Sequence, residues 1–282
     1  MKLGIVTPLL NAQDYFTACA ASVNSNKFAD AEYSLTHYVR ESSNSKVSCA
    51  DVASQYGCNY VQDDDSGIYD AIGKGLDAAC ADGAEVLCWL NADEQVLPSA
   101  YSTVTAAFKK YPGSDIIFGD YLLFNPFDLQ IISARREIPA RLGYLRNGVN
   151  YLMSCAVFFR SNVWLEHEKF DDSYKFLADK KFYLSALESG VAVRHIRHYL
   201  GAYGVTGHNA SLSTQAIAEQ KRLREEIGAS SLFIRAISKI GRVSEKALRR
   251  CYGCKLINTT LYDNNGDPHS CDKVVGSSWK VK

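Results

Sequence analysis

Residues 63–75 read DDDSGIYDAIGKG, and residues 89–94 read WLNADE. Between these two stretches, apolar residues recur at helical spacing from Ile68 to Cys80, and an apolar run over 85–90 predicts a buried strand. The window from Asp63 to Glu94 therefore places one acidic cluster before a helix and a second one where a strand stops. Carboxylates just past the carboxyl end of a strand are where open α/β sheets hold metals and nucleotides. This window is a candidate nucleotide-sugar and metal site.

Strand and helix patterns alternate along the first 120 residues. The pattern predicts a mixed, mostly parallel α/β sheet with helices on both faces. Residues 121–150 predict long loops with a hairpin. The predicted strands are 3–7, 33–40, 59–61, 85–90, 116–120, 156–160 and 191–199, and the predicted helices are 11–23, 47–56, 68–80, 99–111, 177–187, 214–227 and 232–250.

The bulk composition is that of a soluble globular protein, with 47% hydrophobic and 22% charged residues. A formal net charge of zero argues against a dedicated nucleic-acid binder. Nine scattered cysteines, no run long enough to span a membrane and a strand-like start that leaves no room for a signal peptide favour a reducing cytoplasm. Charge is uneven, because residues 235–255 hold seven Lys or Arg against one Glu.

Several ordered segments resemble glycosyltransferase family 2, the inverting sugar-nucleotide transferases of the GT-A fold. Residues 65–75 are similar to a pattern of the bacterial surface-polysaccharide subgroup, Asp-x-Gly-Ile-Tyr-Asp-Ala-Met-Asn-Lys-Gly, and LNADE at 90–94 is similar to its Leu-Asn-x-Asp-Asp. IVTPLLNA at 5–12, AVFFR at 156–160 and FDDSYKFLAD at 170–179 follow the subgroup in order. The resemblance spans roughly residues 3–213 and implies a GT-A (Rossmann-like) sheet flanked by helices.

We expect three parts along the chain, of which the resemblance implies the first and the residue pattern predicts the other two. Residues 1–213 form the GT-A glycosyltransferase domain, with a nucleotide-sugar-binding half over 1–120 and an acceptor half over 121–213. Residues 214–255 form a helical, basic amphipathic extension, and we expect residues 256–282 to be an irregular tail.

The resemblance assigns a set of residues to the sugar nucleotide. Asp65 and Glu41 are expected to accept hydrogen bonds from base or ribose, and Lys74 to pair with a phosphate. For these three the alternatives are solvated loop acids and a surface lysine. The expected donor-binding residues are Thr7, Pro8, Asn11, Glu41, Asp65, Lys74, Asn91 and Ala92.

A divalent ion, Mn²⁺ or Mg²⁺, is expected to neutralise the leaving diphosphate. Asp93 matches the last acid of the metal motif, and His208 resembles the family's late His/Ser segment that reaches the diphosphate or metal. Asn91 stands where a carboxylate is more usual, so it is expected to contact ribose or a bound water. The alternative is that Asp93 and Glu94 cap the helix that follows.

Asp179 is the expected general base, which the resemblance places at the start of a helix on the acceptor side. A base that deprotonates the attacking hydroxyl gives single displacement with inversion. The alternative is an acid that only complements the helix dipole. The subgroup commonly has aromatic and acidic residues at the next positions, where this chain has Lys180 and Lys181.

The sequence therefore predicts transfer of a sugar, with a UDP-sugar favoured, to a hydroxyl of a glycan or lipid-linked acceptor in surface polysaccharide biosynthesis. The basic segment 135–146 is a candidate contact for an anionic acceptor. Residues 232–250 are a candidate contact for an anionic membrane, for a partner or for the chain's own domain. The alternatives are a sugar nucleotidyltransferase and a non-catalytic scaffold or regulatory partner. Residues 8–11 lack the Gly and basic residues of a nucleotidyltransferase loop.

Overall fold

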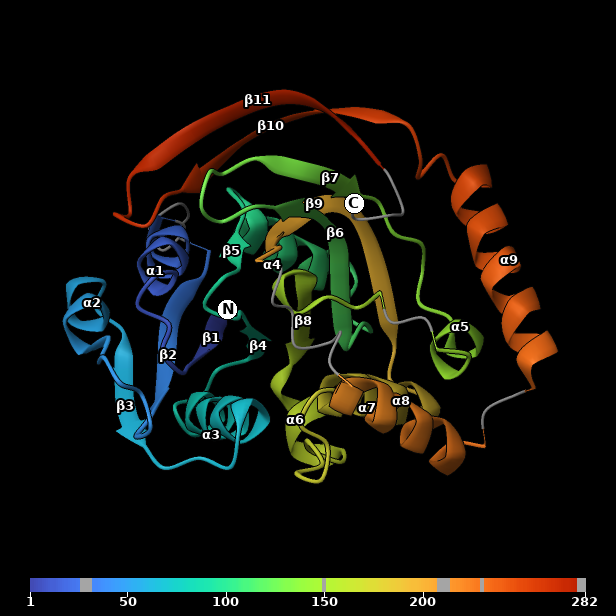
Figure 1. Cartoon of the computed structure of the whole chain (residues 1–282), viewed down its shortest axis with the longest axis horizontal. Coiled ribbons are helices and arrows are strands. Elements are labelled where there is room, and N and C mark those ends of the chain that lie inside the picture. Colours follow the sequence, from blue (N-terminus) through green and yellow to red (C-terminus); the bar gives the residue numbers. More distant parts are fainter. Residues whose placement is uncertain (26–31, 149–150, 207–213, 229–230, 278–282) are drawn as a thin grey trace.

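The computed structural model describes residues 1–25, 32–148, 151–206, 214–228 and 231–277. Its framework is a nine-stranded sheet with helices on both faces (Figure 1). The sheet strands are β1 (Lys2–Leu9), β2 (Ser34–Ser42), β3 (Asn59–Asp63), β4 (Val86–Trp89), β5 (Gln95–Val96), β6 (Ile116–Phe124), β7 (Ile131–Arg135), β8 (Val157–Arg160) and β9 (Val193–Gly204). The helices are α1 (Phe16–Ser25), α2 (Ala50–Gln55), α3 (Ile68–Ala81), α4 (Ala100–Lys110), α5 (Leu142–Arg146), α6 (Ser161–Glu166), α7 (Ala178–Glu188), α8 (Thr214–Glu226) and α9 (Leu232–Leu248), and a short 3₁₀ turn covers Ser154–Ala156.

The strand order is β3-β2-β1-β4-β8-β6-β9-β5, with β7 paired to β6. Strands β1 to β4 are mutually parallel, β8 runs antiparallel to both β4 and β6, and β9 runs parallel to β6. The predicted mixed, mostly parallel α/β sheet is confirmed. Because β1 and β4 are adjacent and parallel, their carboxyl ends meet at one edge of the sheet.

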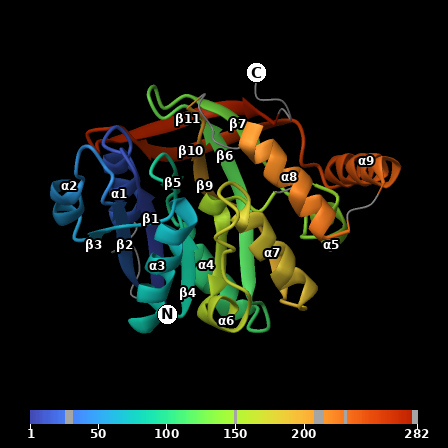
Figure 2. The ribbon, with the colours of Figure 1, turned by 60° about the horizontal axis from the view of Figure 1, so that its bottom comes forward.

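Alternation along β1 divides the core into two layers. Leu3 and Ile5 face one core with α1 and α4, whereas Val6 faces the other with α3, α6 and α7. Figure 2 shows α3, α6 and α7 together on one side of the sheet. Helix α3 lies so close to β1 that a Cβ on Gly75 would stand 2.3 Å from Val6 Cγ1. The glycine that ends the DDDSGIYDAIGKG stretch is thus required by packing.

Two predicted elements differ in extent from the observed ones. The helix predicted over 11–23 begins only at Phe16, because Asn11 has a φ of 50°, outside the helical region, and residues 12–15 form a turn. The hairpin predicted within 121–150 is present, since β6 runs on to Phe124 and pairs antiparallel with β7.

The expected irregular tail over 256–282 is wrong for the described part of that segment. Strands β10 (Cys254–Tyr262) and β11 (Pro268–Gly276) pair in antiparallel register and arch over the sheet from the end of α9 (Figure 1). Ile257, Leu261 and Val275 join a core with residues of β6, β7 and β9. Only three residues of the hairpin are fully buried, and its exposed face also carries apolar side chains such as Leu256 and Val274, so the sequence shows no clear alternation.

Helix α9 is joined to the sheet domain through a buried ion cluster. Glu137 accepts from Lys246 Nζ at 2.9 Å and from Arg242 Nη2 at 2.6 Å. Glu137 and Lys246 are both buried, and burial lowers the pKa of Lys246. Within the described residues, no helix combines the length and apolar character needed to cross a membrane.

We expect Glu137→Gln to lower the free energy of unfolding by about 3 kcal/mol, because two cations lose their shared carboxylate in a desolvated site. Urea unfolding followed by circular dichroism measures this change. The matched control is Glu188→Gln, which removes a half-exposed pair with Arg146 at 2.7 Å and should change stability by less than about 1 kcal/mol. Equal effects of the two substitutions would contradict the structural role of the buried cluster.

Candidate functional site

A pocket of about 410 Å³ opens at the sheet edge where β1 and β4 end. Its volume is in the range of small-molecule sites. Three segments build most of it: residues 8–12, the start of α3, and the turn after β4. The lining residues are Pro8, Leu9, Leu10, Asn11, Ala12, Tyr15, Asp65, Gly67, Ile68, Ala71, Asn91, Ala92, Asp93 and Thr206.

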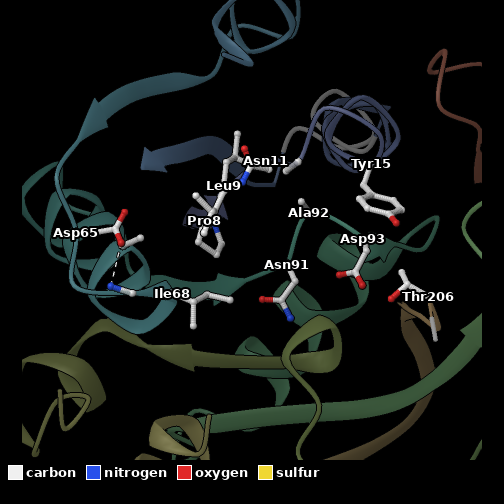
Figure 3. A pocket seen from close by; sticks show the side chains of 14 residues that line it. Pro8, Leu9, Asn11, Tyr15, Asp65, Ile68, Asn91, Ala92, Asp93 and Thr206 are labelled. Carbon is white, nitrogen blue, oxygen red and sulfur yellow. Dashed lines mark hydrogen bonds between the residues drawn. The ribbon is translucent and has the colours of Figure 1, made fainter. Parts of the chain in front are cut away.

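Two carboxylates lie at opposite ends of this pocket (Figure 3). Asp65 is at one end, and Asp93 is at the other beside Tyr15 and Thr206. Asn91 lies between the two carboxylates. One carboxylate from each acidic cluster of the sequence window therefore faces the same cavity.

The turn after β4 is held by Glu94, which points away from the pocket into the core. Its fully buried carboxylate accepts from the Asn91 backbone N–H at 2.9 Å, from Asn91 Nδ2 at 3.2 Å and from Ser154 Oγ at 2.6 Å. The Glu94 N–H in turn donates to the Asn91 carbonyl at 3.0 Å. These bonds fix the backbone on both sides of Asp93. The alternative that Asp93 and Glu94 cap the following helix is wrong, because β5 comes next and α4 starts only at Ala100.

Gly204, the last residue of β9, packs against the turn that contains Asp93. A Cβ on Gly204 would stand 2.3 Å from the Asp93 carbonyl oxygen, so only glycine allows this approach. Burial raises the pKa of Asp93 to about 6, and among the described residues no cation counteracts the shift. Burial, followed by the charge of Asp93, raises the pKa of Glu94 to about 8. The pocket thus holds a desolvated carboxylate that gains from a bound cation.

Asp65 and Asn11 combine a place in the pocket with local structural bonds. Asp65 Oδ1 accepts from the Gly67 N–H at 2.9 Å, which shapes the entry to α3. Asn11 Oδ1 accepts from the Lys46 N–H at 2.9 Å, and its own N–H donates to Ser45 Oγ at 3.3 Å. Asn11 therefore pins the loop after β2 against the end of β1.

Three of the expected donor-binding residues do not line the pocket. Thr7 is buried and its hydroxyl lies 2.8 Å from His37 Nε2. Glu41 is fully buried and accepts from the Cys49 N–H at 2.9 Å and from Tyr60 at 2.5 Å, while its Oε1 has no partner among the described groups.

The third expected donor-binding residue that does not line the pocket is Lys74. Its ammonium group lies 3.4 Å from Asp70 Oδ2 and 4.0 Å from Asp63 Oδ2. His208 falls in 207–213, outside the described residues. The structure therefore brings Pro8, Asn11, Asp65, Asn91, Ala92 and Asp93 together in one pocket.

Asp179 lies in the first turn of α7 and is joined to α3 by a tyrosine. Tyr69 Oη donates to Asp179 Oδ1 at 2.9 Å and lies 3.1 Å from the Phe176 carbonyl oxygen. Burial raises the pKa of Asp179, and the hydrogen bond from Tyr69 opposes the shift. Sequence reasoning missed this role, although Tyr69 stands inside the quoted stretch and its aromatic O–H was the available signal.

Of the two lysines after Asp179, Lys181 has ion-pair partners and Lys180 is buried. Lys181 Nζ pairs with Asp171 at 2.5 Å and with Glu226 at 3.3 Å, which ties α7 to α8. Lys180 is buried, and burial lowers its pKa to about 8. The departures from the subgroup pattern thus coincide with this chain's own helix contacts.

The basic segment over 135–146 does not form one surface. Arg146 pairs with Glu188, and Arg141 pairs with Glu245 on α9 at 2.8 Å. Arg136 instead lines a second cavity of about 350 Å³, together with Arg197, His198 and residues of β10. This cavity contains no residue of the Asp63–Glu94 window.

No protein-family model matches the chain, and no curated protein matches it. Solved structures of S. aureus TarS match the structure of the chain. The match to one TarS structure covers 96% of this chain and 60% of that chain, with 12% identity and a TM-score of 0.58. The match to TarS 1–349 in complex with UDP covers 99% of this chain and 100% of that chain, with 12% identity and a TM-score of 0.57. The match to the complex with UDP-GlcNAc covers the same shares of the two chains, with 10% identity and a TM-score of 0.54. The chain therefore has the mixed α/β GT-A fold.

Asp93 makes the unliganded fold less stable as pH rises, because its pKa of about 6 in the folded chain exceeds the ordinary 3.8. Between these values the folded state binds more protons than the unfolded state, so stability falls over that window. We expect Asp93→Asn to have no effect at pH 4 and to stabilise the protein at pH 7 by on the order of 1–3 kcal/mol. Thermal unfolding in the presence of a chelator measures this.

Asp171→Asn is the control of opposite sign. The hydrogen bond from Lys181 lowers the pKa of Asp171 to about 2, so this variant should lose stability at pH 7 and approach the wild type as the pH falls through that value. A gain for Asp93→Asn that is the same at pH 4 and pH 7 would show that desolvation of the Asp93 carboxylate is not its source.

Proposed function

We propose that the chain is an inverting glycosyltransferase. It transfers a sugar from a nucleotide-diphosphate sugar, with UDP-sugars favoured, to a hydroxyl of a glycan or lipid-linked acceptor in surface polysaccharide biosynthesis at the cytoplasmic side of a membrane. The observation that carries the proposal is the Asp93 carboxylate, desolvated and aimed into a small-molecule pocket that Asp65 closes at the far end. The GT-A fold, shared with TarS structures that hold UDP and UDP-GlcNAc, supports it.

In this proposal the sugar nucleotide lies along the pocket, with its nucleoside at the Asp65 end and its diphosphate at the Asp93 end. The nucleoside lies against residues 8–12 and Asp65, whose second carboxylate oxygen accepts from base or ribose. The diphosphate lies at the turn over Asn91, Ala92 and Asp93. Glu41 remains a predicted contact to the base, since its Oε1 has no partner among the described groups.

The donor set of the pocket fits Mn²⁺ or Mg²⁺ held mainly by the sugar nucleotide. These ions prefer oxygen, and with phosphate ligands they need only one or two protein carboxylates. Asp93 supplies one, and within the described part of the chain no group of three or more His, Cys, Asp or Glu forms an all-protein site. When bound, the ion neutralises charge on the leaving diphosphate. His208 remains a proposed second ligand.

Asp179 serves as the general base in this reaction. The acceptor oxygen bonds to the anomeric carbon while the bond from that carbon to the diphosphate oxygen breaks. The electron pair leaves with the nucleoside diphosphate, and the hydroxyl proton passes to an oxygen of Asp179. The raised pKa of Asp179 makes it a stronger base than an exposed carboxylate. Tyr69 orients that carboxylate and, through α3, couples it to the donor pocket.

Two substitutions should separate donor binding from chemistry. We expect Asp93→Asn to weaken Mn²⁺-dependent UDP binding at least tenfold by calorimetry. Asp179→Asn should leave UDP binding unchanged and lower turnover of UDP-GlcNAc by about 10²–10⁴-fold. The control Asp172→Asn removes an exposed acid of the same region and should change neither. A folded protein that binds no sugar nucleotide with either ion would favour the scaffold alternative.

Tyr69 should act by positioning Asp179. We expect Tyr69→Phe to lower kcat about tenfold with little change in UDP affinity, and to move the acid limb of the pH–rate profile to higher pH. The reason is that the ionised carboxylate loses its hydrogen bond, so its pKa rises. Tyr144→Phe, which removes a 3.1 Å bond to Glu245 elsewhere, is the matched control. A lower rate with an unmoved pH profile would assign Tyr69 a merely structural role.

A further inference from the structure

Helix α9 turns its apolar side outward. Phe233 is 73% exposed, Ile237 52% and Ile240 66%, while the end of the helix exposes Leu248 at 84%. Phe233, Ile237 and Ile240 recur every three or four positions, and Leu248 follows about two turns later on the same side, so they form one stripe along the helix. Leu232, Ile234 and Val243 add to the exposed apolar surface. We call this surface the α9 stripe.

The polar side of α9 is locked against the rest of the chain. Lys246 and Arg242 reach the buried Glu137, and the Arg141 guanidinium donates two hydrogen bonds of 2.8 Å to Glu245. Turning the helix to bury its stripe would break all of these ion pairs. The outward stripe is therefore a fixed feature of the fold rather than a helix docked on its wrong face.

Exposed apolar side chains continue into the hairpin that follows the helix. Leu256 on β10 and Val274 on β11 are in register and are 72% and 63% exposed. Figure 1 shows α9 leading directly into β10, at the end of the hairpin away from its turn. Exposed apolar side chains are thus also present on the hairpin that follows the helix.

The charges around the stripe are basic. Lys239, Arg249 and Arg250 are exposed, and Glu245, the one acid between 232 and 250, is held by Arg141 and Arg249. A second copy of this surface would bring like charges together without matching acids. An anionic lipid surface instead takes both the cations and the apolar side chains.

From this arrangement we infer that α9 is an interfacial membrane-binding helix, which lies along an anionic bilayer with the α9 stripe among the acyl chains and Lys239, Arg249 and Arg250 at the headgroups. Its 17 residues give a contact about 25 Å long. Helix α5 packs against both α9 and α7, and α7 carries Asp179. If the proposed function holds, these contacts connect the acceptor side, through α5, to the helix that binds lipid, which suits a lipid-linked acceptor.

Vesicle flotation tests this inference without any activity assay. We expect the full chain to bind vesicles of phosphatidylcholine and phosphatidylglycerol in equal parts, and to bind pure phosphatidylcholine vesicles at least tenfold more weakly. Ile237→Asp combined with Ile240→Asp should weaken binding to the anionic vesicles tenfold or more, because the stripe loses apolar area and gains negative charge. Lys239→Gln combined with Arg250→Gln should weaken it severalfold, and added salt should do the same.

The matched control is Ile217→Asp on α8, which alters another exposed isoleucine, 62% exposed, outside the stripe. It should bind like the wild type, and circular dichroism should show all variants folded. Failure of the folded wild type to bind anionic vesicles would overturn the inference. So would a dimer, seen by sedimentation velocity, that the double aspartate variant dissociates while vesicle binding is absent.

Discussion

The geometry of the candidate site depends on the buried carboxylate of Glu94, which does not itself line the pocket. Glu94 accepts from the backbone and side chain of Asn91 and from Ser154, and so fixes the turn in which Asp93 sits. The chain thus keeps an acid with a pKa near 8 in its core. Burying such a group is tolerable only because three donors meet it. Gly204 packs against the same turn, so β4 and β9 together determine where the Asp93 carboxylate lies.

The same constraint connects the two halves of the domain. Ser154 belongs to the segment before β8, and its hydroxyl reaches back to the turn after β4. Tyr69 makes a second connection, from the helix that lines the Asp93 pocket to Asp179 on α7. Helix α3 therefore links the pocket, which its first turn lines, to the expected base, which its Tyr69 contacts.

Local patterns were enough to predict the parallel half of the sheet and the gathering of Asp65, Asn91 and Asp93 at one edge. They were insufficient where a tertiary contact decides the outcome. In the sequence, Glu94 is a second acid beside Asp93. Only its buried hydrogen bonds with Asn91 and Ser154 show that it stabilises the turn. The β10–β11 hairpin buries only three residues and exposes Leu256 and Val274, so its sequence shows little alternation. The α9 pattern is clear, but Glu137, about 100 residues earlier, decides which side faces out.

We propose that this pocket binds a nucleoside diphosphate with its phosphates at Asp93. A crystal structure of the protein with UDP and Mn²⁺ tests it most directly. We expect the diphosphate to lie against the Asn91–Asp93 turn, the metal ion on the Asp93 carboxylate and the nucleoside toward Asp65. Phosphate density in the second cavity beside Arg136 and His198, with the Asp93 pocket empty, would contradict it.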